Sequence, residues 1–176
     1  MVQPGGRVVE PAAQVQEVIS PETAYIITSM LQSVVQRGTG KRAAALQRPT
    51  AGKTGTTNDL DDAWFIGYTP QLLAGVWVGF DEKRTLGRLE TGGHVAAPIW
   101  LHFMEQALEN EPILDFPVPD GISFVLINPH TGQRSLGGGG FLECFKRGTE
   151  PAVVAAQPVT AAVAPAPEHE VTSDVD

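Results

Sequence analysis

Cysteine is nearly absent from this sequence: Cys144 is the only one among 176 residues. A lone cysteine cannot form an intrachain disulfide, and it offers no cluster of thiolates for a metal. Histidine does not replace it, because His94 lies in a glycine loop and His102 is not placed to share a helix face with it as a second ligand. We therefore expect no metal and no cofactor.

Basic residues are also scarce, with 12 Lys and Arg against 20 Asp and Glu and a formal net charge of −8. This balance excludes a nucleic-acid partner, because phosphate binding needs a surplus of Lys and Arg on one face. Long apolar runs are missing too, since no stretch approaches the roughly 18 apolar residues of a membrane span. The first residues lack the basic-then-apolar pattern of a signal peptide. We expect neither a membrane span nor a signal or anchor in this chain.

The clearest local signal predicts a helix over residues 21–37. Ser20 is a good N-cap, Pro21 suits the first helical position and Glu22 favours the positive end of the helix dipole. Apolar residues then recur at three- and four-residue spacing until Gly38 supplies a stop signal. Before this helix, residues 7–19 contain a short β-branched run that could form a strand. After it, residues 41–48 form a basic, alanine-rich connector.

Extended structure is predicted after Pro49, which biases the residue before it to extended geometry. The aromatic and β-branched runs 64–69 and 72–80 flank a turn and predict a hairpin of adjacent strands. Because both runs are almost continuously apolar, we expect strands covered on both faces in the middle of a sheet. Helical spacing predicts a second helix over 96–110.

The rest of the chain carries weaker signals. Residues 112–119 are expected to be extended and punctuated by proline, 122–127 to form a strand that ends in a turn at 128–132, and 137–140 to be flexible. From Gly148 onward the sequence is rich in Ala, Val and Pro and ends in acidic residues, with too little large apolar surface to offset the entropy of ordering. We therefore divide the chain into a folded portion, 1–147, and a disordered acidic tail, 148–176.

The stretch from Ala51 to Asn58, Ala-Gly-Lys-Thr-Gly-Thr-Thr-Asn, places a lysine and several hydroxyls just before the predicted hairpin. A phosphate-binding loop is one interpretation of Gly52-Lys53-Thr54. It fails because Gln47 occupies the position of the first glycine and strand-like residues, not a helix, follow the lysine. The other interpretation is the Lys-Thr-Gly element of serine penicilloyl transferases.

The surrounding sequence resembles the C-terminal part of the transpeptidase domain of class A bifunctional penicillin-binding proteins, 1A type. The resemblance extends from about Val8 to Thr149. It rests on the segments 51–58, 62–70 (Asp-Ala-Trp-Phe-Ile-Gly-Tyr-Thr-Pro), 75–81 (Gly-Val-Trp-Val-Gly-Phe-Asp), 91–93 (Thr-Gly-Gly) and 97–100 (Ala-Pro-Ile-Trp), and on the segments 20–25 and 36–40 around the first helix. It implies an α/β (α+β) fold, part of the antiparallel sheet with flanking helices that serine β-lactamases and penicillin-binding proteins share.

The resemblance also implies roles for individual residues. An edge strand lets a peptide add alongside it by main-chain hydrogen bonds. Lys53 would offer a positive charge to a terminal carboxylate and support the catalytic network, Thr54 and Thr56 would hydrogen-bond that carboxylate, and Gly55 would let the acyl group approach. The backbone N–H of Thr56 would be one of two oxyanion donors. Thr57 completes the expected substrate-binding set.

The implied activity is D,D-transpeptidation, the cross-linking of peptidoglycan stem peptides ending in D-Ala-D-Ala, with β-lactams acylating the same serine. The implied location is the periplasmic side of the bacterial inner membrane. However, none of the serines has lysine three residues on or asparagine two residues on, so no nucleophile is identified in this chain; they are Ser20, Ser29, Ser33, Ser123, Ser135 and Ser173. We predict an isolated chain without transpeptidase activity, with the remainder of the domain as its partner. The alternative is a non-catalytic peptide-binding or docking module.

Three further features allow two interpretations. Asp59, Asp61 and Asp62 could suggest a cation site, but their spacing lacks the glycine and glutamate of a calcium loop, which favours a solvated turn. The tryptophans at 64, 77 and 100 are expected in the core, with Trp64 the one that could face a ligand. Thr91-Gly92-Gly93 is either a wall of the cleft or a plain turn.

Overall fold

The computed structural model describes residues 16–135 and 139–153. Its first element is helix α1, Pro21–Arg37, which confirms the prediction. Ser20 caps it, because the backbone N–H of Thr23 donates to the Ser20 hydroxyl at 3.3 Å, and the N–H of Gly38 returns to the carbonyl of Val34 at its end. The expected strand at 7–19 lies mostly outside the described residues, and residues 16–19 form no strand.

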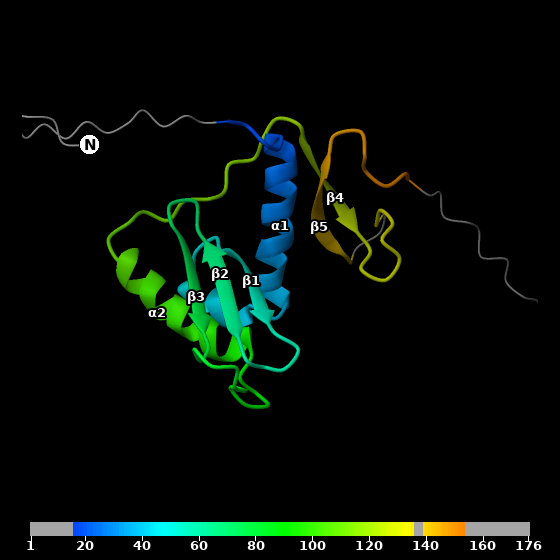
Figure 1. Ribbon diagram of the computed structural model, residues 1–176. Coiled ribbons are helices and arrows are strands. Elements are labelled where there is room, and N and C mark those ends of the chain that lie inside the picture. The colour runs from blue at the N-terminus through cyan, green and yellow to red at the C-terminus, as the bar shows by residue number, and fades with distance from the viewer. Residues whose placement is uncertain (1–15, 136–138, 154–176) are drawn as a thin grey trace, which may run out of the picture.

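A three-stranded antiparallel sheet follows α1 in the order β1-β2-β3 (Figure 1). Between the helix and the sheet, the basic connector folds as a short 3-10 helix, η1, Lys41–Leu46. The strands are β1, Ala51–Thr56, β2, Ala63–Tyr68, and β3, Leu73–Val78. The predicted hairpin is confirmed as β2 and β3, which pair in register from Ala63 with Val78 to Tyr68 with Leu73.

One face of this sheet packs against helix α2, Ala97–Ala107, as Figure 1 shows. A π-helical turn, η2, Gly92–Ala96, precedes α2 where a plain loop was expected. Phe65, Trp100 and Met104 are the largest fully buried side chains. The Phe65 and Trp100 rings meet edge to face with centroids 5.2 Å apart. The indole N–H of Trp100 is shared by the carbonyls of Gly67 and Ala74, at 3.2 and 3.1 Å.

The prediction that the strands are covered on both faces is wrong for the described residues. Side chains alternate along a strand, so Phe65 points into the core while its neighbours Trp64 and Ile66 are 44% and 47% exposed. Trp77 is likewise 44% exposed. The expected core position is therefore correct for Trp100 and wrong for Trp64 and Trp77, because a continuous apolar run does not reveal which side of it is covered.

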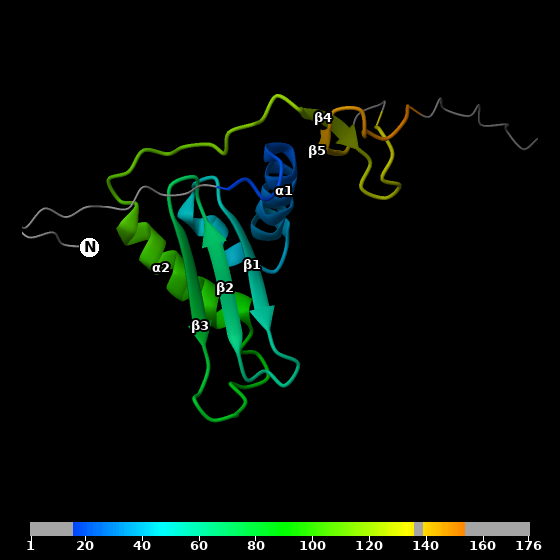
Figure 2. The ribbon, with the colours of Figure 1, turned by 45° about the horizontal axis from the view of Figure 1, so that its top comes forward.

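A second, two-stranded sheet lies on the other side of α1 (Figure 2). It consists of β4, Ile122–Ile127, as predicted, and β5, Phe141–Lys146, which the sequence analysis missed. Residues 112–119 carry neither helix nor strand, and the turn after β4 is fixed by the Asn128 side chain, which accepts the N–H of His130 at 2.8 Å. Contacts with β4 continue to Glu150, whose carboxylate accepts the Ser123 hydroxyl. Residues 154–176 of the expected tail lie outside the described residues.

Within residues 16–135 and 139–153, no helix combines the length and the apolar character that crossing a bilayer requires.

Candidate functional site

Strand β1 is buried at its N-terminal end and exposed to solvent toward its C-terminal end. Thr50 and the first two strand residues, Ala51 and Gly52, are buried, whereas Lys53 and Thr56 are exposed. The strand pairs with β2 on one side only, so in the described part of the chain its other edge has no strand partner. An unpaired edge presents backbone N–H and C=O groups to which an extended peptide can add.

Lys53 lies on this exposed half. Its ammonium group donates to the carbonyl of Thr54, the next residue of the strand, at 2.6 Å. The ion pairs found among residues 16–135 and 139–153 involve Lys83 and do not include Lys53. The Lys53 charge is therefore available to an anion from outside the described chain.

The two faces of the sheet divide the residues of β1. Residues opposite each other in adjacent strands share a face, and the register sets Lys53 beside Ile66 and Gly55 beside Trp64. Thr54 instead pairs with the buried Phe65, on the face that α2 covers. Lys53 and Gly55 thus lie on one face of the strand, and the side chains of Thr54 and Thr56 start on the other face.

Both threonine hydroxyls have partners there. The Thr54 hydroxyl lies 2.7 Å from that of Thr39, just after α1. The Thr56 hydroxyl accepts the backbone N–H of Gly92 at 3.1 Å. Gly92 must be glycine, because a Cβ would lie 2.1 Å from the Trp64 carbonyl oxygen and 2.5 Å from that of Gly55. The Thr91-Gly92-Gly93 segment is therefore packed directly against the end of the strand and is not a plain turn.

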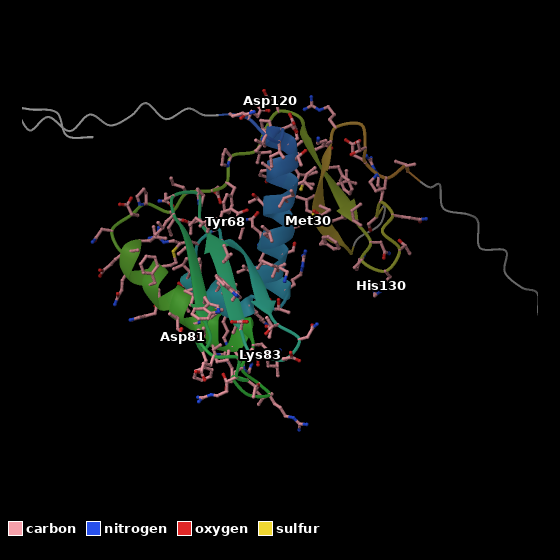
Figure 3. All side chains as sticks on the ribbon, viewed as in Figure 1. Met30, Tyr68, Asp81, Lys83, Asp120 and His130 are labelled. Carbon is pink, nitrogen blue, oxygen red and sulfur yellow. The ribbon has the colours of Figure 1, made fainter. Side chains whose placement is uncertain are left out.

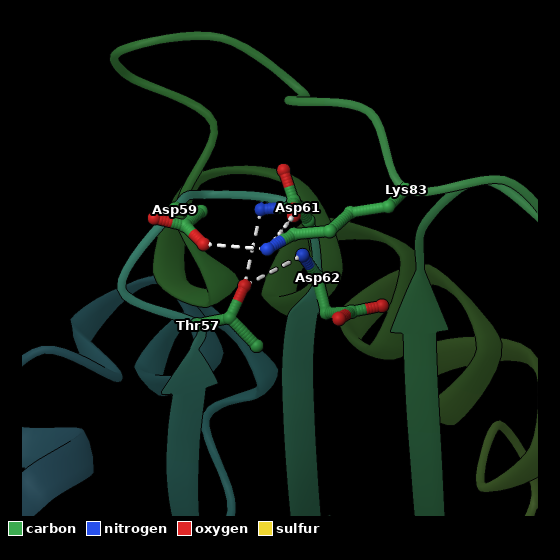
Figure 4. A network of polar contacts seen from close by, with 5 residues as sticks. All are labelled: Thr57, Asp59, Asp61, Asp62 and Lys83. Atoms are coloured by element: carbon green, nitrogen blue, oxygen red, sulfur yellow. Dashed lines mark hydrogen bonds and ion pairs between the residues drawn. The ribbon is translucent and has the colours of Figure 1, made fainter.

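Thr57 begins the loop between β1 and β2 and holds it together. Its hydroxyl accepts the backbone N–H groups of Asp61 and Asp62, both at 3.0 Å (Figure 4). Lys83, after β3, lies 2.7 Å from Asp59 and 3.7 Å from Asp61. The hydrogen bond from Lys83 and its charge lower the pKa of Asp59, and the same contacts raise the pKa of Lys83. The Thr57 hydroxyl thus already serves the loop, while its proposed contact with substrate stays a prediction.

A cavity of about 660 Å³ opens at this end of the sheet, lined by the loop, by Thr56 and by Asp81. Figure 3 shows Asp81 and Lys83 at this end, with Tyr68 at the opposite one. The carboxylates do not form a cation site, since the Lys83 ammonium lies between Asp59 and Asp61. No group of three or more His, Cys, Asp or Glu suited to a metal occurs within the described ranges.

Several serines have structural contacts of their own. Ser20 caps α1, Ser33 accepts a hydrogen bond from Arg37, Ser123 donates to Glu150 and Ser135 donates to the carbonyl of Gly139. These contacts agree with the sequence, in which no serine carries the lysine or asparagine spacing of a transpeptidase nucleophile or its partner. A contact of this strand that the sequence analysis did not single out is that of Thr39, whose link to Thr54 spans 15 positions and leaves no local pattern.

Comparison with known proteins matches residues 3–105 to the family model "Penicillin binding protein transpeptidase domain". The chain is 47% identical over 159 residues to penicillin-binding protein 1A of Pseudomonas aeruginosa, covering 88% of this chain and 19% of that protein. It is 42% identical over 130 residues to penicillin-binding protein 1A of Aquifex aeolicus, covering 73% of this chain and 18% of the relative.

Its structure is similar to the crystal structure of penicillin-binding protein 1A from Haemophilus influenzae, with a TM-score of 0.72 and 38% identity. That match covers 78% of this chain and 22% of the other. The chain therefore spans about a fifth of the length of the proteins it is similar to.

Proposed function

Because the chain belongs to the penicillin-binding protein transpeptidase family, with the antiparallel sheet and flanking helices that the sequence predicts, we propose that it supplies the substrate-binding strand of a D,D-transpeptidase. The substrate is a peptidoglycan stem peptide ending in D-Ala-D-Ala, and β-lactams occupy the same site. The proposal assigns peptide and carboxylate binding to Lys53, Thr54, Gly55, Thr56 and Thr57.

The observation that carries this proposal is the exposed half of β1. It combines an unpaired strand edge with the Lys53 ammonium, which has no carboxylate partner among the described residues. A peptide that adds along such an edge gains main-chain hydrogen bonds. Its terminal carboxylate gains a charge-assisted contact with the lysine, and such contacts are about twice as strong as neutral hydrogen bonds.

The chemistry needs a serine from outside this sequence. In the family resemblance, the serine oxygen attacks the carbonyl carbon of the penultimate D-Ala, the terminal D-Ala leaves with a proton as the free amino acid, and an amine of a neighbouring stem peptide displaces the serine. The backbone N–H of Thr56 would donate to the oxyanion that forms on that carbonyl. Lys53 would hold the carboxylate and support the protonation state of the serine network.

The partner of this chain is then the rest of the transpeptidase domain. The exposed apolar side chains of Trp64, Ile66 and Trp77 support this, because a patch of large apolar residues marks a surface that another protein segment covers. A peptidoglycan substrate also supports a location on the periplasmic side of the bacterial inner membrane. The isolated chain, without the serine, is proposed to be inactive.

The test uses a chimera in which this chain replaces the matching segment of Pseudomonas aeruginosa penicillin-binding protein 1A. We expect the chimera to take up one equivalent of a fluorescent penicillin per active site and the isolated chain to take up none, as measured by intact mass. Lys53→Met should slow acylation of the chimera about ten- to hundredfold, the value of a lost charge-assisted hydrogen bond. Lys41→Ala, at an exposed lysine of η1, is the control and should leave the rate unchanged.

Two results would contradict the proposal. An adduct on the isolated chain would show that one of its own serines is activated. A chimera that folds but stays unlabelled, beside a labelled parent enzyme, would show that this strand does not support acylation. Binding of a D-Ala-D-Ala peptide by the isolated chain, with no labelling of the chimera, would instead support the non-catalytic peptide-binding module.

A further inference from the structure

We propose that Thr39 is a positioning residue for carboxylate recognition. Its hydroxyl donates to Thr54 and so directs the Thr54 proton toward the carboxylate of the bound peptide or β-lactam. The inference rests on the proposed function, because it concerns the same site, but it adds a residue 15 positions away from the strand contact that it controls.

Thr39 is held rigidly enough for this role. It follows α1 between Gly38 and Gly40, whose N–H groups both return to the carbonyl of Val34, at 3.0 and 3.1 Å. On the other side, the carbonyl oxygen of Thr39 lies 2.4 Å from the place where a Cβ on Gly93 would stand. The end of α1 and the glycine turn thus fix the backbone of Thr39 against the strand.

The direction of the hydrogen bond follows from the number of protons. A threonine hydroxyl has one proton to donate and two lone pairs that accept. A carboxylate only accepts, so each threonine that binds it must donate its single proton outward. Thr54 can do so only if it accepts from Thr39 across their 2.7 Å contact.

Thr56 shows the same arrangement with an unambiguous donor. Its hydroxyl accepts the Gly92 N–H, and this leaves the Thr56 proton free for a ligand. Thr39 and Gly92 therefore do equivalent work: each supplies a donor from the packed side of the strand and each leaves one hydroxyl proton for the substrate. The reverse direction at Thr54 would present lone pairs to a negatively charged group, which repels it.

The experiment compares Thr39→Val and Thr39→Ser in the same chimera, with acylation rates measured for a penicillin and for its methyl ester. The ester lacks the carboxylate charge, so the acid-to-ester ratio reports carboxylate recognition alone. We expect Thr39→Val to lower the rate with the acid about tenfold and to leave the ester rate unchanged, in line with the loss of one hydrogen bond to a charged group. Thr39→Ser, which keeps the hydroxyl, should stay within about twofold of the original.

Thr28→Val is the matched control. Thr28 lies on α1 and forms a similar hydroxyl pair with Tyr68 at 2.9 Å, at the opposite end of the sheet from the site, and its loss should not change the ratio. An unchanged ratio in Thr39→Val, or equal losses for acid and ester, would overturn the role of Thr39 while leaving the proposed function intact. A wild-type chimera that is not acylated at all would overturn the proposed function and this inference with it.

Discussion

The two faces of the three-stranded sheet differ in how far the described chain covers them. One face, the packed face, carries Phe65, which is fully buried against Trp100 of α2, and partly buried side chains of β3. The other, the open face, carries Trp64, Ile66 and Trp77, each between 44% and 47% exposed. Both faces carry large apolar side chains, so their different exposure comes from what covers them.

The open face also carries part of the proposed substrate-binding set. Lys53 and Gly55 share it with Ile66 and Trp64, and the rings of Trp64 and Trp77 lie together with centroids 6.3 Å apart. The packed face provides stability from within the described chain, whereas the open face offers a charged residue and apolar surface to something else. Stability thus comes from the packed face, whereas the proposed substrate contacts come from both faces: Lys53 and Gly55 from the open one, Thr54 and Thr56 from the end of the packed one.

The largest expected effect comes from truncating neighbours on the two faces. Phe65→Ala should lower the free energy of unfolding of the full chain by about 3–5 kcal/mol, since it leaves a cavity beside Trp100. Ile66→Ala should cost less than about 1 kcal/mol, because the side chain is already half exposed. Urea unfolding followed by tryptophan fluorescence measures both. Equal losses would mean that the open face is covered in the isolated chain, for example by self-association.

A smaller effect is expected at Arg48, which holds the C-terminal end of α2 against the rest of the chain. Arg48 donates to the carbonyls of Leu108 and Glu111 at 2.6 and 2.9 Å and to that of Pro112 at 3.1 Å. A cation there also suits the negative end of the α2 dipole. Arg48→Ala should destabilise the chain by about 1–3 kcal/mol. Arg88→Ala, at an exposed loop position, is the control. If Arg48→Ala lowers the free energy of unfolding no more than the control does, α2 stays in place without Arg48.

The smallest effect is expected beyond the strand ends, at the exposed pair Asp59 and Lys83. The pKa of Asp59 is lowered by Lys83, so its contribution to stability is present near neutral pH and is lost as pH falls below about 4. The pKa of Lys83 is raised, so its contribution is lost only above about pH 10. Melting temperatures of wild type and Asp59→Asn should differ slightly at pH 7 and converge at pH 3. If the difference in melting temperature grew toward low pH, the assigned direction of the Asp59 contribution would be wrong.

Local signals explain what the sequence predicted well. Helix α1 has its cap, its proline and its stop residue within its own segment, and the structure reproduces its bounds. Strand β5 was missed because its short mixed run becomes a strand only by pairing with β4. The expected two-sided cover of β2 failed for a similar reason, since exposure depends on what packs above the strand and not on the strand itself.

The candidate site divides in the same way. The residues from Lys53 to Thr57 could be identified because they are contiguous and match a known motif. The hydrogen bonds that Thr39 and Gly92 make to that motif could not, because both residues come from other elements and meet β1 only in the folded chain. The sequence marked Gly92 only as part of a possible cleft wall. The sequence shows which residues stand at these positions, but the hydrogen bonds they make depend on distances that only the folded chain sets.

The packed face also constrains how this protein can change over generations. Gly52 and Gly67 stand opposite each other in β1 and β2, and a Cβ at either would lie 2.8 Å from the Phe65 ring, with Trp100 equally close to the second. Every single replacement of either glycine adds at least that atom. In a library of random variants, a folded protein with a replacement at Gly52 or Gly67 should therefore also carry a smaller residue at Phe65 or Trp100. Tolerated diversity should accumulate instead at positions such as Leu89, which lies outside the sheet in the segment after β3 and is 71% exposed.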